Sequence, residues 1–145
     1  MLKVSLLSDS AKPPTLAHPG EDLGYDLYAS DSGWIPPGEY HVFHTGIAVE
    51  FVFESEPELK FGFLIKERSS LAVNGISVLG GVVDSGYRGE IHLVLANHGN
   101  TDYPVVAGAK IANLIPIPVV ANKVEVVANL TPSLRGDGAF GSTGA

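Results

Sequence analysis

The stretch GEIHLVLAN (residues 89–97) begins with polar and apolar side chains in alternation. A period of two places every second side chain on one face and is typical of a half-buried β-strand. Other short runs along the chain are also rich in Val, Ile, Leu and Phe. We therefore predict strands at Lys3–Leu7, Tyr40–Phe43, Gly46–Phe53, Leu59–Ile65, Glu90–Asn97, Tyr103–Val106, Ile111–Pro116 and Lys123–Val127.

Turn-forming residues separate these runs, with 17 glycines and ten prolines among 145 residues. Pro-Pro-Gly in WIPPGEY (residues 34–40) predicts a turn between two strands. Only Ser69–Asn74 has a helical pattern, with Gly75 as its expected C-cap. With no repeat and no linker in sight, the sequence predicts one all-β domain, a barrel or sandwich of many short strands.

The composition is globular, with 45% hydrophobic and 17% charged residues. A net charge of −7 with only nine Lys and Arg argues against a nucleic acid or an acidic membrane as partner. An anionic ligand would need a few placed cations, backbone N–H groups or a metal. There is no cysteine, no signal peptide is recognisable, and no apolar run is long enough to span a membrane, so we expect a cytoplasmic protein.

Four stretches, polar or rich in glycine, carry candidate chemistry. Arg68-Ser69-Ser70 stands at the expected helix start, where N–H groups and hydroxyls favour an anion, although an ordinary N-cap serine is the simpler interpretation. In GGVVDSGYRGE (residues 80–90) we predict a β-hairpin turning at Gly86. There Asp84 could act as a base and Tyr87 could lie against a sugar or base, unless they only form the turn and pack across it.

Two carboxylates, Asp22 and Asp26, lie four residues apart in a Gly-rich stretch and could serve Mg²⁺, with turn formation as the simpler alternative. The five histidines show no zinc-site spacing, and His41 and His44 should point to opposite faces of one strand. We assign them no chemistry.

The last residues, RGDGAFGSTGA (residues 135–145), cannot form a core by themselves, and a frayed terminus is the usual outcome. Yet Arg135 and Phe140 are unusual residues to leave in water, and Gly-Ser-Thr-Gly could cradle a phosphate. We predict a tail that closes over a ligand with a phosphate group and a flat ring. All three arginines, including Arg68 and Arg88, fall in these candidate stretches, which points to a polyanionic ligand.

Taken together and in order, these stretches resemble the five motifs of the trimeric deoxyuridine triphosphatases (dUTPases). The counterparts are GYDLYA around Asp26, RSSLA (residues 68–72), GGVVDSGYRGE (residues 80–90), GAKIANL (residues 108–114) and RGDGAFGSTG (residues 135–144). The resemblance covers nearly the whole chain. It implies a distorted jelly-roll fold of one domain over residues 1–145, with residues 135–145 as a flexible C-terminal arm. It also implies a homotrimer whose active sites are shared between subunits.

The resemblance further implies hydrolysis of dUTP to dUMP and pyrophosphate with Mg²⁺. Asp84 would activate the water that attacks the α-phosphorus, and Asp26 would bind waters of the Mg²⁺ shell. The residues implied in substrate binding are Arg68, Ser69, Ser70, Gly81, Val83, Tyr87, Asn113, Arg135, Phe140, Gly141, Ser142 and Thr143. Within that set, Tyr87 would pack on the deoxyribose, the loop backbone would bind uracil, and Phe140 would stack on it.

The chain departs from the family pattern at Gly86, where a second Asp is common, at Asn113, where Gln is usual, and at Ala139, where Gly is usual. The sister family of dCTP deaminases shares several of these stretches, but its catalytic Glu aligns with Val94, which cannot carry a proton. Two other classes remain as alternatives: a relative that has lost catalysis and regulates a partner, and a purely structural jelly roll.

Overall fold

The computed structural model describes residues 1–120, 123–134 and 136–137. This part of the chain is nearly all β, with one short helix, α1 (Ser69–Ala72). Its strands are β1 (Leu2–Leu6), β2 (Tyr25–Tyr28), β3 (Gly33–Ile35), β4 (Tyr40–His44), β5 (Ile47–Phe51), β6 (Phe61–Lys66), β7 (Ile76–Leu79), β8 (Val82–Val83), β9 (His92–Asn97), β10 (Tyr103–Val105) and β11 (Lys110–Pro118). The all-β prediction is confirmed. Among the described residues, no helix has the length and apolar character needed to cross a membrane.

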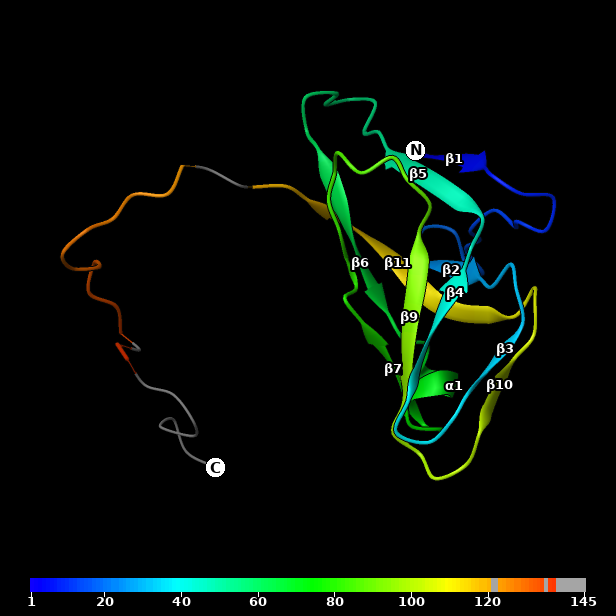
Figure 1. Ribbon diagram of the computed structural model, residues 1–145. Coiled ribbons are helices and arrows are strands. Elements are labelled where there is room, and N and C mark those ends of the chain that lie inside the picture. The colour runs from blue at the N-terminus through cyan, green and yellow to red at the C-terminus, as the bar shows by residue number, and fades with distance from the viewer. Residues whose placement is uncertain (121–122, 135, 138–145) are drawn as a thin grey trace.

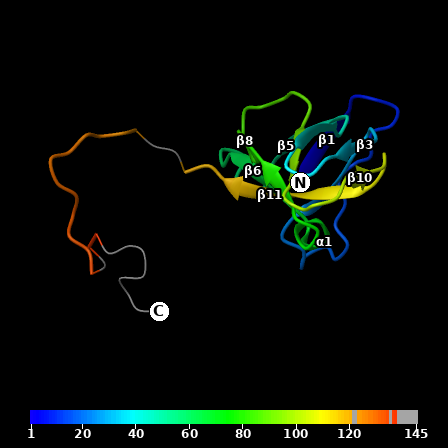
Figure 2. The same ribbon diagram turned by 60° about the horizontal axis from the view of Figure 1, so that its bottom comes forward.

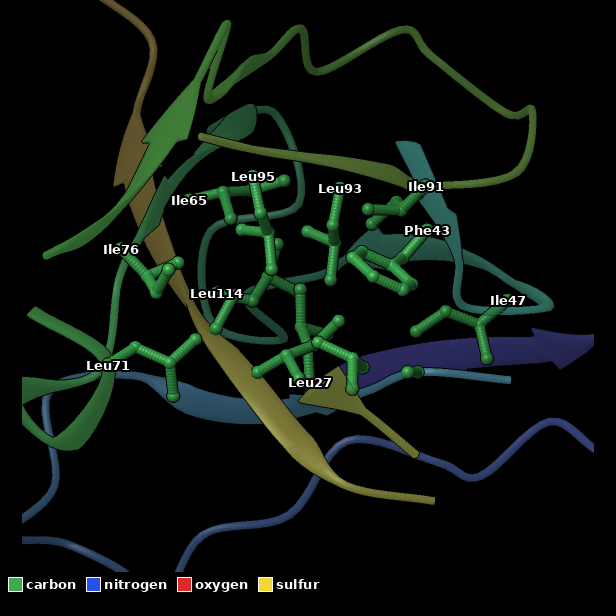
Figure 3. Close-up of a cluster of buried hydrophobic side chains, with 14 of the residues drawn as sticks. Leu27, Phe43, Ile47, Ile65, Leu71, Ile76, Ile91, Leu93, Leu95 and Leu114 are labelled. Atoms are coloured by element: carbon green, nitrogen blue, oxygen red, sulfur yellow. The ribbon is translucent and has the colours of Figure 1, made fainter. Parts of the chain in front are cut away.

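The strands form four small antiparallel sheets around one interior (Figure 1). Their orders are β2-β11-β6-β8, β4-β9-β7, β1-β5 and β10-β3. Figure 3 shows side chains from several of these strands meeting in the core, among them Leu27, Phe43, Leu93 and Leu114. On β9, Leu93 and Leu95 are fully buried while His92 is exposed, so the period of two is confirmed up to Leu95, after which Ala96 and Asn97 are both buried.

The longest strand, β11, lies between β2 and β6 and brings distant parts of the sequence together. Asn113 pairs with Asp26 on one side and with Lys66 on the other. Between Lys110 and Ala112 the register with β2 shifts by one residue, which is a β-bulge. Because the bulge adds one residue, Lys110 and Asn113 reach the same face although they are three apart in sequence.

Four strands were not predicted: β2, β3, β7 and β8. Each has at most four residues and lies next to glycine or polar residues, so its pattern is too short to stand out. The strand predicted at Lys123–Val127 is wrong, because these residues form no strand and all are exposed. An extended run needs a neighbouring strand to satisfy its backbone, and the described part of this chain provides none there.

The turn predicted in residues 80–90 is confirmed, but the hairpin is not. The Tyr87 N–H donates to the Asp84 carbonyl at 3.0 Å, which closes a four-residue turn. The flanking strands do not pair with each other, since β8 pairs with β6 and β9 pairs with β4 and β7. Residues 80–90, called the Gly80–Glu90 loop below, therefore connect two different sheets.

The predicted helix ends earlier than expected, at Ala72 rather than Asn74. Gly75 follows with a φ of 77°, which fits its expected role after the helix. The N-cap is Arg68, with no side-chain capping hydrogen bond, so the simpler interpretation of an N-cap serine is wrong.

The start of the Gly80–Glu90 loop is held against β6 by direct backbone contact. The Ile65 N–H donates to the Gly81 carbonyl at 2.7 Å. A Cβ added at Gly81 would lie 2.4 Å from the Ile65 carbonyl oxygen, which is far inside van der Waals contact. Only glycine allows the loop to approach this closely.

We predict that Gly81→Ala destabilises the protein by about 1–3 kcal/mol, because the methyl group forces the loop away from β6. Gly86→Ala is the matched control, since a Cβ there meets nothing within 4 Å. Urea unfolding of both variants measures the difference. If both variants had the same free energy of unfolding, the close contact between Gly81 and the Ile65 carbonyl would be contradicted.

Candidate functional site: a cavity beside Asp26 and the Gly80–Glu90 loop

A buried carboxylate lies at the centre of the first half of the site. The Asp26 side chain is 12% exposed and accepts from two cations: Arg68 Nε at 3.0 Å and Lys110 Nζ at 2.8 Å. A carboxylate removed from water is stable only when it is paired in this way. The hydrogen bond to Asp26 also raises the pKa of Lys110 above its ordinary value.

A cavity of about 400 Å³ opens beside this cluster. Arg68, Ser69 and Asn113 line it together with Asp26, so three predicted motifs meet here. Arg68 uses Nε for Asp26, and the terminal N–H groups of its guanidinium are further donors that a ligand could use. A guanidinium, a hydroxyl and an amide around one cavity form a set of groups suited to phosphate oxygens.

The other acidic residue of this stretch, Asp22, serves a turn. Its carboxylate accepts from the His18 backbone N–H at 2.7 Å, and this bond is the main reason that the pKa of Asp22 is lowered. The alternative of turn formation is therefore confirmed for Asp22. Asp22 nevertheless lines the same cavity as Asp26.

The second half of the site is a cavity of about 240 Å³ at the Gly80–Glu90 loop. Val83, Asp84 and Tyr87 line it, along with the start of β9. The Asp84 side chain is exposed. The Tyr87 hydroxyl donates to the Glu90 carbonyl at 2.9 Å, which fixes the ring across the loop above Gly89.

The two halves lie apart within the chain. Their cavities share no lining residue. In Figures 1 and 2, α1 and the loop between β8 and β9 lie at opposite ends of the β structure. Ser70 and Gly81 line neither cavity. Five further predicted residues lie outside the described residues: Arg135, Phe140, Gly141, Ser142 and Thr143.

Arg88 has a structural role, so the gathering of the three arginines in the candidate stretches is weaker evidence for a polyanionic ligand. Its guanidinium donates to Glu50 at 2.8 Å and to the backbone carbonyls of Ser85 and Tyr87 at 2.8 and 3.0 Å. Arg88 therefore closes the Gly80–Glu90 loop and ties it to β5. Of the described arginines, Arg68 is the one that lines the phosphate-compatible cavity.

Known proteins place the chain in a family of enzymes. The dUTPase family model matches residues 9–144. The deoxyuridine 5'-triphosphate nucleotidohydrolase of Clostridium tetani is 42% identical over 99% of this chain and 96% of that protein. The enzyme of the same name from Gloeothece citriformis is 43% identical over 99% of this chain and 96% of its own length. The chain therefore belongs to the dUTPase family.

Solved structures agree on the fold. The dUTPase of Staphylococcus bacteriophage 80alpha, solved with dUpNHpp, superposes with a TM-score of 0.88 at 24% identity, covering 100% of this chain and 99% of that one. A mutant dUTPase from phage phi11 of S. aureus, described with a structural Mg(II) ion, gives a TM-score of 0.77 at 22% identity, covering 89% of this chain and 97% of that one. The jelly-roll prediction is thus confirmed.

Sequence reasoning missed Lys110 as a partner of Asp26. The residue stands in the quoted stretch GAKIANL, but a regular strand would have placed it on the face opposite Asn113. The bulge after Lys110 reverses that orientation. The orientation of the Lys110 side chain follows only from the pairing register of β11 with β2.

We predict that Asp26→Asn lowers the melting temperature at neutral pH by several degrees, because Arg68 and Lys110 lose their common carboxylate. The folded-state pKa of Lys110 is raised, so its contribution to stability is present at neutral pH and is lost as pH rises through that pKa. The difference in melting temperature between wild type and Asp26→Asn should therefore narrow from about pH 10 upward.

Thermal melts between pH 7 and pH 11 measure this difference. Asp22→Asn is the control, because Asp22 contacts no lysine and its pKa is lowered, well away from this range. A difference that stays constant up to pH 11 would contradict the role given to Lys110.

Proposed function

We propose that the chain hydrolyses dUTP to dUMP and pyrophosphate, which limits uracil incorporation into DNA and supplies dUMP for dTMP synthesis. The observation that carries this proposal is the dUTPase family match over residues 9–144. The geometry supports it, because one cavity suits a polyphosphate and the other presents an exposed carboxylate beside an aromatic ring.

The polyphosphate would lie in the cavity beside Asp26. Arg68 supplies a charged fork, Ser69 supplies a hydroxyl at the start of α1, and Asn113 supplies an amide from β11. Ser70 does not line this cavity, and its proposed part in phosphate binding rests on the resemblance. The ion pair with the Asp26 carboxylate holds the Arg68 guanidinium in place. A fixed cation offsets the charge that develops on phosphate oxygens without having to reorganise during the reaction.

The nucleoside would lie at the Gly80–Glu90 loop. Asp84 is the proposed general base, and its exposed carboxylate can take a proton from the attacking water. The Tyr87 ring, fixed through its hydroxyl, would pack on the deoxyribose. The loop backbone around Gly81–Tyr87 would offer N–H and C=O groups to uracil, and it would reject cytosine by leaving polar groups unpaired.

Mg²⁺ is the proposed cofactor, and the donor set fits an indirect role for Asp26. Each Asp26 oxygen already accepts from a cation, so direct ligation would have to displace Arg68 or Lys110. Each oxygen also keeps a second lone pair that can accept from a water. Mg²⁺ usually retains several of its waters, so Asp26 would hold the hydrated ion, whose charge would neutralise the triphosphate.

The C-terminal residues 135–145 would form an arm that closes the site of the single domain. Phe140 would stack on uracil, and the γ-phosphate would be bound by Arg135, Gly141, Ser142 and Thr143. These residues lie outside the described part of the chain, so this role rests on the resemblance and on their chemistry. Closure would exclude water and strengthen each electrostatic contact.

A homotrimer would unite the two halves of the site. Within one chain the two cavities are separate, so a complete site would combine the Gly80–Glu90 loop of one chain with the Asp26 cavity of another. The segment after β11 also favours assembly. Every residue from Lys123 to Leu134 is exposed, Val124 and Val126 are 94% and 96% exposed, and Figure 1 draws this segment away from the sheets.

We predict that Asp84→Asn lowers kcat for dUTP at least about a hundredfold, since a general base typically contributes a factor of that order. Pyrophosphate release from dUTP, dCTP, dTTP and UTP with Mg²⁺ measures both activity and selectivity. Consumption of dCTP with release of ammonia would instead indicate a deaminase. Failure of wild type to cleave any of the four, while still binding dUTP, would indicate a relative that acts through a partner.

A mixing experiment tests whether sites are shared. Chains carrying Asp84→Asn and chains carrying Arg68→Ala should each be nearly inactive alone. After co-refolding in equal amounts, about a quarter of the sites should receive an intact loop and an intact cavity from different chains, so activity should reappear. No gain on mixing would place both halves of each site in one chain.

We predict that Val124→Asp combined with Val126→Asp weakens assembly, because charge replaces the apolar side chains that a neighbouring chain would cover. Light scattering should show wild type at three times the 15.2 kDa chain mass and the variant at lower mass. Asn129→Asp, which adds charge to the same exposed segment without removing apolar surface, is the control. An unchanged mass for the double variant would count against a role of this segment in assembly.

A further inference from the structure

Two histidines and a glutamate form a cluster at the junction of β4 and β9. His44 ends β4, His92 begins β9, and the two are direct partners in the antiparallel register. Glu90 lies two residues before His92, and its carboxylate contacts the rings of both histidines. Residues directly opposite on one face of a strand pair have closely spaced side chains. Their rings accordingly lie 4.8 Å apart between centroids, edge to face.

The ligand atoms of this cluster already converge. His44 Nδ1 and His92 Nε2 lie 3.3 and 3.4 Å from the same carboxylate oxygen, Glu90 Oε2. No two of the three ligand atoms are more than 4.8 Å apart. Bonds of about 2.0–2.1 Å in a tetrahedral zinc site put neighbouring ligands about 3.3 Å apart. Two of the three separations therefore match such a site before any side chain moves.

The backbone holds these ligands in place. The Gly46 N–H donates to Glu90 Oε1 at 2.8 Å, and the His44 N–H donates to Asp31 Oδ1 at 3.0 Å. Burial raises the pKa of Glu90, but the Gly46 bond and the nearby imidazoles lower it more, so the net shift is downward. The carboxylate is therefore ionised at neutral pH and is able to bind a cation.

We propose that His44, Glu90 and His92 bind one Zn²⁺ or a similar transition-metal ion per chain, with water as a further ligand. Imidazole nitrogen favours zinc, copper, nickel and iron over Mg²⁺, so this site differs in chemistry from the magnesium site discussed above. The His44 and His92 side chains are 53% and 41% exposed, which leaves a path for the ion and room for the water.

The position of the site gives it a structural consequence. Glu90 and His92 also line the cavity at the Gly80–Glu90 loop, whereas His44 belongs to β4. A bound ion would therefore link the end of the loop to the neighbouring strand by bonds stronger than the present hydrogen bonds. Binding to the folded chain alone stabilises it by mass action.

Titration calorimetry with ZnCl₂ on EDTA-treated full-length protein tests the proposal. One ion should bind per chain, Zn²⁺ should raise the melting temperature, and excess Mg²⁺ should not compete. His44→Gln and His92→Gln should each weaken binding at least tenfold. His41→Gln, the same change on the opposite face of β4, should leave binding unchanged. The absence of saturable binding, equal affinity in all three variants, or one ion for several chains would overturn the proposal.

A second measurement needs no substitution. In wild-type protein, Zn²⁺ should shift the imidazole NMR signals of His44 and His92 and leave those of His41 in place. Shifts at other histidines with none at His44 and His92 would overturn the assignment even if the variants failed to fold.

Discussion

The arrangement of the site depends on one buried ion cluster, the Asp26 carboxylate between Arg68 and Lys110. Asp26 stands next to the fully buried Leu27 on β2, and its own side chain is only 12% exposed, so most of its charge is removed from water. Burying such a charge is tolerable only when cations and hydrogen bonds surround it. The need to surround Asp26 with cations holds β2, the start of α1 and the start of β11 in fixed relative positions. The cavity lies where these three elements meet.

Strand β6 connects this cluster to the Gly80–Glu90 loop. Its Ile65 binds the Gly81 backbone, and two residues after its end Arg68 reaches Asp26. The spacing between the loop and the cavity of one chain is therefore set by a rigid β-strand rather than by a flexible connection. Rigid elements position functional groups more accurately than loops do.

Much of the fold could be predicted from sequence, because alternation in runs such as GEIHLVLAN reports burial directly. The failures have physical reasons. Strand β8 has two residues and no readable period, and Lys123–Val127 has the right composition but lacks a neighbouring strand among the described residues. Motif residues around Asp26 and Asp84 could be found by resemblance. The bulge at Lys110 and the pairing of His44 with His92 depend on register, which a single sequence does not specify.

The exposed run from Lys123 to Leu134 has a consequence for the life of a newly made chain. In the proposed homotrimer other copies would cover this run, and before assembly its exposed valines would be open to proteases and to other unfolded segments. The rate of the proposed assembly would rise with the concentration of the protein, whereas the rate of cleavage of a single chain would not. Cleavage in this run would also remove the residues that follow it. If the chain assembles as proposed, chains made at low concentration would therefore be more open to cleavage in this run.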